Sequence, residues 1–368
     1  VTSGGICSRT RSSVFSAKYA TTTIANWESF SSFLEGFLTA VLVRAITLET
    51  HTPHKKRIVH PLWMPAPSDT PMVSVIIPCY QAEKTLKECL SSVVHQDYSR
   101  FEILAIDDGS TDRTAEIIRS FPSVRYLAQP NQGASAARNK GFETARGDIF
   151  LLLDSDAKVF PGWISQHVEE QKKGHVVGGS VVPWDDTFWG LCDHYSTWYE
   201  YYPQRPRAED RYQISSTNLS IHRSVVKKIG VFDTQIKGIE DAEYTHRMRK
   251  NGFSITFVPH IRMAHHDRET LRGFLKHHFV YGYNAPSVRK KNSGTRFSGL
   301  MPQTPLAAAL MLVPLAVLHT GFVVWNWLPS RGEAIAFTPF IFLSKLYHAW
   351  GIYCGIRDGI GNEKRSPT

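Results

Sequence analysis

Two aspartates directly follow an apolar segment near the middle of the chain. Residues 149–153 carry no polar side chain, and Asp154-Ser155-Asp156 comes next. Two carboxylates this close repel, so one is driven to take up a proton unless a cation lies between them. Oxygen ligands favour Mg²⁺ or Mn²⁺, which often bind substrate phosphates too. The alternative is a solvated loop or a helix cap near Pro161, because Asp-x-Asp is common by chance.

Acidic residues also follow the apolar segment 101–106. Asp107 and Asp108 come directly after it, and Asp112 lies four residues further on. Asp112 is typical of a helix start, whereas capping explains Asp108 less well. A carboxylate at this point can accept hydrogen bonds from a base or a ribose.

A third acidic pair, Glu240-Asp241, opens a segment predicted to be helical up to Asn251. Acids in the first turn of a helix complement its dipole, so the pair by itself fits a structural role as well as a catalytic one.

Strand-like and helix-like segments alternate around these acids. We expect strands over 73–77, 101–106, 124–127, 149–153 and 254–258, and helices over 82–95, 112–120 and 134–145. This alternation predicts an α/β fold with a mainly parallel sheet and helices on both faces. Ligands of such sheets bind at the carboxyl ends of the strands, where the first two acidic groups fall.

The amino-acid composition limits the classes of binding partner that we expect. The 368 residues are 42% hydrophobic with a formal net charge of +9, which suits a large core and a polyanionic partner. No motif that reads RNA or DNA is present, so nucleic acid is not expected. Five scattered cysteines predict neither a disulfide framework nor a zinc site and favour a reducing compartment.

Apolar segments near the C-terminus indicate a membrane. Residues 305–328 contain no Asp, Glu, Lys or Arg and are long enough to span a bilayer, whereas 334–356 contain Lys345 and His348 and are weaker. As a hairpin, their basic flanks place the main domain in the cytoplasm. A buried helical pair in a soluble protein is the alternative. A broken apolar stretch, 30–46, and a Pro-rich linker, 51–71, precede the regular part.

Four segments in a fixed order carry a family resemblance. They are VSVIIPCY (73–80), IDDGSTD (106–112), NQGASAARNKG (131–141) and LLDSD (152–156). Together they resemble the family 2 glycosyltransferases, which have a GT-A fold with a Rossmann-type mixed sheet. Segments 216–224 and 238–244 extend the resemblance to about residues 73–290.

The resemblance implies a donor site for a nucleotide-diphosphate sugar, a UDP- or GDP-sugar. The end of the first strand and the acidic turn would bind the nucleoside through Pro78, Tyr80, Asp107 and Asp108, with Asp108 towards the base. Arg138 would lie near the nucleotide or its phosphates, since a guanidinium pairs well with phosphate.

The resemblance also implies a metal and a base. Asp154 and Asp156 match the metal-binding pair, with Asp156 as the direct ligand. His265 would be a further ligand, and His260, His277 and His278 are the alternatives to it. Mn²⁺ or Mg²⁺ would stabilise the leaving nucleoside diphosphate. Asp241 matches the base that takes the acceptor's proton, and Glu240 would orient the acceptor.

The expected reaction is a single inverting displacement onto a membrane-linked saccharide or glycolipid. A Gln-x-x-Arg-Trp segment, typical of processive synthases, is missing from the sequence, which favours transfer of one sugar. Two alternatives stay open: a polyprenyl-phosphate sugar synthase, which needs no base, and a catalytically silent membrane scaffold with the same fold.

The expected domains are an N-terminal extension (1–70), a GT-A domain (71–290, with a donor half 71–182 and an acceptor half 183–290) and a membrane-associated helical hairpin (291–368). The aromatic stretch 184–202 suits sugar rings or a membrane interface, or else the core of a packed subdomain.

Overall fold

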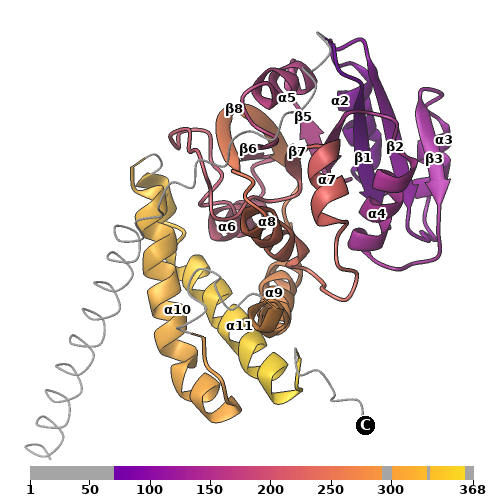
Figure 1. Cartoon of the computed structure of the whole chain (residues 1–368). Coiled ribbons are helices and arrows are strands. Elements are labelled where there is room, and N and C mark those ends of the chain that lie inside the picture. Colours follow the sequence, from indigo (N-terminus) through magenta and orange to yellow (C-terminus); the bar gives the residue numbers. More distant parts are fainter. Residues whose placement is uncertain (1–69, 292–300, 330–331, 361–368) are drawn as a thin grey trace, which may run out of the picture. The chain divides into compact units, whose positions relative to one another are not determined.

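The computed structural model describes residues 70–291, 301–329 and 332–360, which all belong to one compact unit (Figure 1). The predicted apolar stretch 30–46 and nearly all of the Pro-rich linker lie outside the described residues. The predicted domain boundaries stay predictions.

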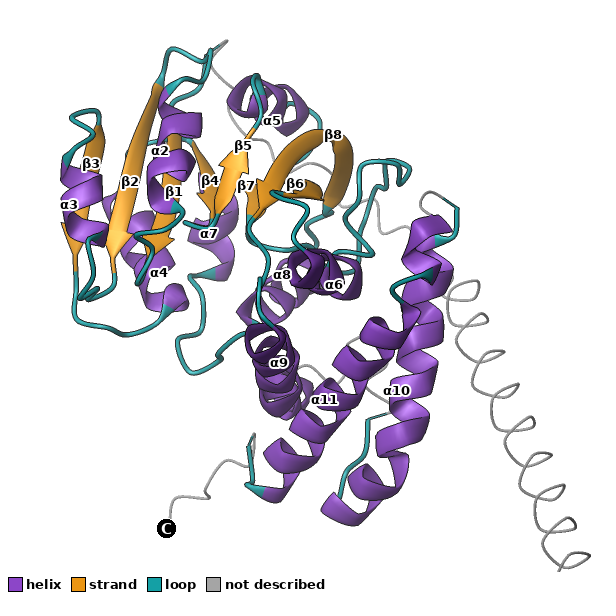
Figure 2. Ribbon diagram, turned by 180° about the vertical axis from the view of Figure 1, so that it is seen from behind, coloured by secondary structure: helices purple, strands orange, loops and turns teal. Residues whose placement is uncertain are grey.

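An eight-stranded sheet has the order β3-β2-β1-β4-β7-β6-β8-β5 (Figure 2). Its strands are β1 (Val73–Cys79), β2 (Phe101–Asp107), β3 (Val124–Ala128), β4 (Ile149–Leu153), β5 (Ala157–Val159), β6 (Val176–Pro183), β7 (Asn218–His222) and β8 (Thr256–His265). The first four strands in chain order are parallel neighbours, whereas β7 and β5 run antiparallel to the strands beside them. The predicted mixed, mainly parallel sheet is therefore confirmed.

Helices surround the sheet and extend beyond it. They are α2 (Leu86–Val94), α3 (Thr114–Arg119), α4 (Ala134–Thr144), α5 (Trp163–Gln171), α6 (Phe188–Thr197), α7 (Arg223–Ile229), α8 (Glu240–Lys250), α9 (Leu271–Lys291), α10 (Pro305–Trp327) and α11 (Thr338–Arg357), with a 3₁₀ turn, η2 (Gly332–Ile335). Helix α2 begins four residues after the predicted start, because residues 82–85 form a turn.

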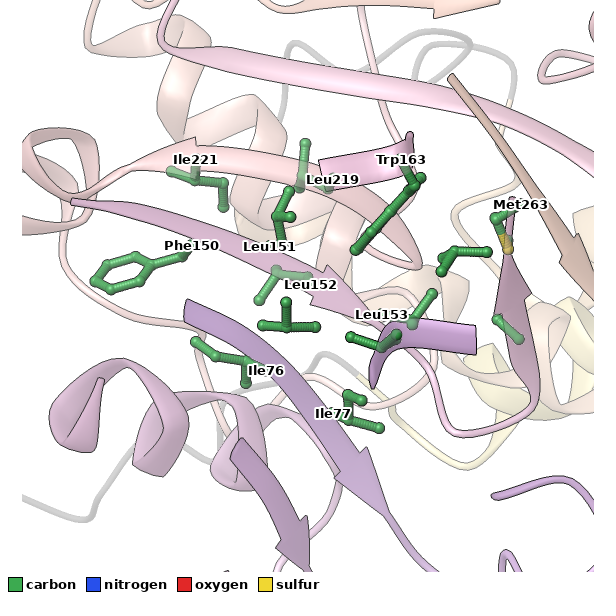
Figure 3. Packing of buried hydrophobic residues seen from close by; sticks show 14 of the residues in the cluster. Ile76, Ile77, Phe150, Leu151, Leu152, Leu153, Trp163, Leu219, Ile221 and Met263 are labelled. Atoms are coloured by element: carbon green, nitrogen blue, oxygen red, sulfur yellow. The ribbon is translucent and has the colours of Figure 1, made fainter. Parts of the chain in front are cut away.

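The core lies along the central strands. Every residue of β1 and β4 is buried, as their largely apolar sequences predict (Figure 3). Ile76 and Ile77 of β1 lie beside Leu152 and Leu153 of β4 in this cluster. A strand buried on both faces fixes where its last residue ends, so the acids that follow β4 emerge at one defined edge.

Strand β8 is longer than predicted. We expected it to end before Pro259, because proline cannot donate to a ladder. Instead the strand continues to His265, and its pairing with β6 shifts register between Gly179 and Ser180. This bulge absorbs the irregular residues and lets the second half of β8 pair with β5, where Ala157 lies opposite His265.

The C-terminal helices pack tightly against one another and against the helices beside the sheet. A Cβ atom on Gly282 of α9 would lie 1.9 Å from the His348 carbonyl oxygen of α11, and one on Gly351 would lie 2.2 Å from that of Phe279. The two helix backbones therefore touch, as small residues allow. Lys345 of α11 donates a 2.7 Å hydrogen bond to the Ser196 carbonyl of α6.

The aromatic stretch forms a second core against these helices. This second core consists of Tyr195, Tyr202, Val323, Trp327, Ala334 and Ile341. Trp327 Nε1 donates to the Tyr195 carbonyl at 2.8 Å, and the Tyr202 hydroxyl to that of Asn326 at 2.9 Å. These aromatic side chains therefore hold α10 against the rest of the unit. Among the described helices α10 alone has the length and composition of a membrane span, which is weak evidence by itself.

Candidate functional site

A buried arginine joins the two acidic groups that the sequence places 86 residues apart. Arg138 of α4 is 4% exposed; its Nη2 donates to Asp154 Oδ1 at 2.7 Å and its Nη1 to Glu240 Oε1 at 2.9 Å. Asp154 directly follows β4 and Glu240 begins α8, so the arginine connects the predicted donor half to the predicted acceptor half. Its predicted place near the nucleotide phosphates stays a prediction, because both terminal nitrogens already bind carboxylates.

The guanidinium of Arg138 keeps its positive charge although it is buried. Burial disfavours the charged guanidinium, but Asp154 and Glu240 outweigh that effect and raise the pKa of Arg138. Its Nε and Glu240 Oε2 are buried and have no hydrogen-bond partner among the described residues. Because unpaired buried polar atoms are costly, this site is built for a polar ligand or for water.

Asp241 lies beside this bridge in the first turn of α8. The carboxylate is partly buried, and its Oδ1 accepts from the Ala242 backbone N–H at 2.8 Å. Burial and the neighbouring charge of Glu240 raise the pKa of Asp241 to about 7. A carboxyl that titrates near neutral pH is well matched to general-base chemistry.

A second cluster lies where β5 meets β8. His265 Nε2 is 3.5 Å from Asp156 Oδ1, and His265 Nδ1 is 2.8 Å from Asp267 Oδ1. Asp267 also accepts from Trp198 Nε1 at 2.9 Å and lies 3.0 Å from His194 Nδ1. The sequence pattern did not single out Asp267, two of whose partners, His194 and Trp198, lie 73 and 69 residues earlier in the chain.

This arrangement sets the orientation of the His265 ring. Burial disfavours its charged form, but Asp156 and Asp267 prevail and raise the pKa of His265 to about 9. The His265 Nδ1–H donates to Asp267, so Nε2 faces Asp156, as in sites where a carboxylate orients a metal-bound histidine. An imidazole nitrogen and a carboxylate oxygen suit a divalent cation, so the residues present fit one.

Two other groups bring three possible metal ligands within 4.8 Å of one another: Asp185 with His266 and Glu269, and Asp193 with His277 and His278. In the second group, the buried Asp193 carboxylate is 2.9 Å from His277 Nδ1 and 3.0 Å from His278 Nε2. Direct contacts of that length need no ion. These groups compete with Asp156 and His265 for the assignment of the metal.

The predicted nucleoside residues gather at the ends of β1 and β2. Pro78 is buried within β1 and Tyr80 is exposed beyond it. Asp107 accepts from the Ser110 N–H at 2.9 Å and the Tyr126 hydroxyl at 3.1 Å. These contacts leave Tyr80 as the ring most accessible to a base.

Asp108 shapes a loop. Its two oxygens accept from the backbone N–H groups of Gln132 and Gly133 at 2.9 and 2.7 Å. Gly133 has φ +90°, which favours glycine, and α4 starts directly after it. Asp108 thereby positions the helix that carries Arg138, and its contact with a base stays a prediction.

A cavity among the described residues lies away from these acids. It measures about 660 Å³, lies between α4 and α7, and is lined by Asn139, Phe142, Arg223 and Lys227 among others. It contains none of the predicted site residues. The candidate site is therefore identified by its ion-paired acidic and basic residues and not by the volume of a cavity.

Known proteins are similar to this chain in sequence. The Glycosyl transferase family 2 model matches residues 74–230. Glycosyltransferase AglE of Haloferax volcanii is 31% identical over 225 residues, which cover 58% of this chain and 73% of the relative. The uncharacterized glycosyltransferase YibD of Escherichia coli is 42% identical over 98 residues, 26% of this chain and 28% of the relative.

One solved structure shares the fold. Mannosyltransferase PcManGT of Pyrobaculum calidifontis, in complex with GDP-Man and Mn²⁺, superposes with a TM-score of 0.54 at 18% identity, covering 88% of this chain and 96% of that one. This likeness confirms the GT-A-like fold. With the family model and the extensive match to AglE, it follows that this chain belongs to the family 2 glycosyltransferases.

Proposed function

We propose that this chain moves one sugar, with inversion, from a UDP- or GDP-sugar to a membrane-linked saccharide or glycolipid at the cytoplasmic face of a membrane. One observation carries the proposal: Arg138 ties Asp154, at the end of a central strand, to Glu240, beside Asp241. The edge of the sheet at which ligands are expected to bind thus lies next to Asp241, the predicted base. A donor bound at that edge presents its sugar to a group of suitable pKa.

A divalent cation, Mn²⁺ or Mg²⁺, would be held by Asp156 and His265 and would offset the charge that develops on the leaving diphosphate. The Mn²⁺ of the similarly folded PcManGT complex supports this assignment. Arg268 adds a positive charge: its Nη1 lies 3.5 Å from Asp156 Oδ2, and its side chain is partly exposed. A guanidinium there suits phosphate oxygens.

The reaction needs one proton transfer. As an acceptor oxygen bonds to the anomeric carbon, the bond from that carbon to the diphosphate breaks, and the acceptor's hydroxyl proton passes to the ionised Asp241 carboxylate. The attack comes from the face opposite the leaving group, so the configuration inverts. Glu240 Oε2, which lacks a described partner, accepts a hydrogen bond from a sugar hydroxyl and orients it.

Donor hydrolysis and binding by the detergent-purified chain test the proposal. A panel of nucleotide sugars is measured with Mn²⁺, Mg²⁺ or chelator, for the wild type, Asp156→Ala, Asp185→Ala and the exposed control Asp186→Ala. We expect metal-dependent use of one donor, lost only in Asp156→Ala. Loss in Asp185→Ala instead would move the metal to the neighbouring group, and no donor binding at all would favour a silent scaffold.

The variant Asp241→Asn distinguishes an alcohol acceptor from a polyprenyl phosphate acceptor. A loss of about 10²–10⁴-fold in kcat is expected for an alcohol acceptor, which needs a base. Activity retained with a polyprenyl phosphate, whose oxygen is already an anion, would replace the glycolipid acceptor by that phosphate.

A further inference from the structure

We propose that α10 lies in the plane of a membrane, with one apolar face in the lipid, and does not cross the bilayer. This inference concerns how the chain meets its membrane and is independent of the donor, the metal and the acceptor.

An exposed apolar stripe runs the length of α10. It consists of Leu306, Leu310, Val313, Val317 and Trp325, whose exposed fractions are 72, 72, 54, 44 and 73%. Their spacing of three, four and eight residues keeps them on one side of a helix. Residues 305–327 contain no charged side chain, so water gains no favourable contact along the stripe.

The opposite face of α10 is covered by protein. Ala308, Ala316, Thr320 and Val323 are buried, and Trp327 packs into the second core. Lipid can therefore reach α10 from one side. This asymmetry is typical of a helix lying at an interface.

The neighbouring helices argue against a span. Helix α11 packs along both α9 and α10, and its contact with α9 is backbone to backbone at Gly282 and Gly351 (Figure 1). A bilayer around α10 would therefore also enclose α9, which carries exposed Arg272 and Lys276 and ends in a basic run, 289–291. Each such charge costs about 2.5–3.5 kcal/mol at the centre of a membrane.

Charge and aromatic placement select lipid as the occupant of the stripe. The chain has a formal net charge of +9, which favours anionic headgroups over another copy of itself. Trp325 is the last residue of the stripe and lies within the last turn of α10, and tryptophan prefers the boundary between headgroups and acyl chains. Apart from this indole, the side chains of the stripe cannot form hydrogen bonds. Such a surface suits lipid better than a protein partner, because protein–protein interfaces have a polar rim.

Vesicle flotation of the full-length chain tests the docking face. The variant Leu310→Gln/Val317→Gln is compared with Val231→Gln/Leu271→Gln, which changes one valine and one leucine outside the stripe that are 44 and 41% exposed. We expect the stripe variant to lose more than about tenfold in partitioning to phosphatidylcholine–phosphatidylglycerol vesicles and the control to match the wild type. Retained donor hydrolysis shows that both variants fold.

Equal partitioning of the two variants would overturn the proposal, because another segment would then make the membrane contact. A stripe variant that turns a dimer into a monomer without changing its flotation would equally overturn it, assigning the stripe to a second copy.

Topology is tested separately with Gln303→Cys and Leu328→Cys, one at each end of α10. We expect a membrane-impermeant maleimide to label both positions from the same side of sealed membranes of expressing cells. Labelling from opposite sides would show that α10 spans the bilayer and would refute the in-plane arrangement.

Discussion

Replacing Arg138 by alanine tests whether the buried bridge organises the site. The change leaves Asp154 and Glu240 in a poorly solvated place without their cation. Removing one partner of a buried ion pair typically costs about 3–5 kcal/mol, since the remaining charge is uncompensated. For a domain of this size each kcal/mol lowers Tm by about 2–4 °C, so we expect a fall of roughly 6–20 °C.

The chain supplies a control of equal geometry. Arg113 also donates to a carboxylate at 2.7 Å, that of Glu116, but the two side chains are 70 and 65% exposed. Water screens the charges of an exposed pair, so Arg113→Ala should change the free energy of unfolding little. Circular dichroism during urea and thermal unfolding, on both variants in the same detergent, measures the difference.

A rescue variant sharpens the test. Arg138→Met combined with Asp154→Asn and Glu240→Gln removes all three charges, and we expect most of the lost stability to return while transferase activity does not. Equal unfolding free energies for Arg138→Ala and Arg113→Ala, within about 0.5 kcal/mol, would refute the buried bridge.

Three further predictions address the base, the metal and the helix packing. Because the pKa of Asp241 is raised to about 7, its folded form binds a proton more readily than its unfolded form, and stability falls as pH rises from about 4 to 7. Asp241→Asn should therefore raise the unfolding free energy by roughly 1–3 kcal/mol at pH 8 and little at pH 4, and it should abolish the tenfold-per-unit fall of kcat/KM below pH 7; an unchanged acidic limb would exclude Asp241 as the base. Asp267→Asn should weaken Mn²⁺ binding about 10–100-fold by calorimetry, whereas the exposed Glu269→Gln should not; the reverse result would place the ion in the Asp185 group. Gly282→Ala should destabilise the chain by more than about 2 kcal/mol, because its Cβ meets the α11 backbone, whereas Gly321→Ala in α10, with nothing within 4 Å, should gain up to about 1 kcal/mol; equal effects would contradict the close contact.

Local pattern in the sequence determined much of the donor half. The unbroken apolar run 149–153 predicts a strand with the bounds of β4, and alternation with helical segments predicts the parallel part of the sheet. These features depend on neighbours in sequence, because a buried strand must be apolar and parallel strands need a helical crossover. The acids after the strands were visible for the same reason.

Tertiary structure alone decided how the acids are used. Arg138 meets a carboxylate 102 residues away, and this contact depends on the sheet order that brings α4 beside α8. The register shift opposite Pro259 carries His265 to Asp156, although the local sequence predicts that the strand ends. Partners such as Asp267 and the glycine contacts of α11 leave no periodic signal, since a single contact between distant segments is set by packing geometry and not by local propensity.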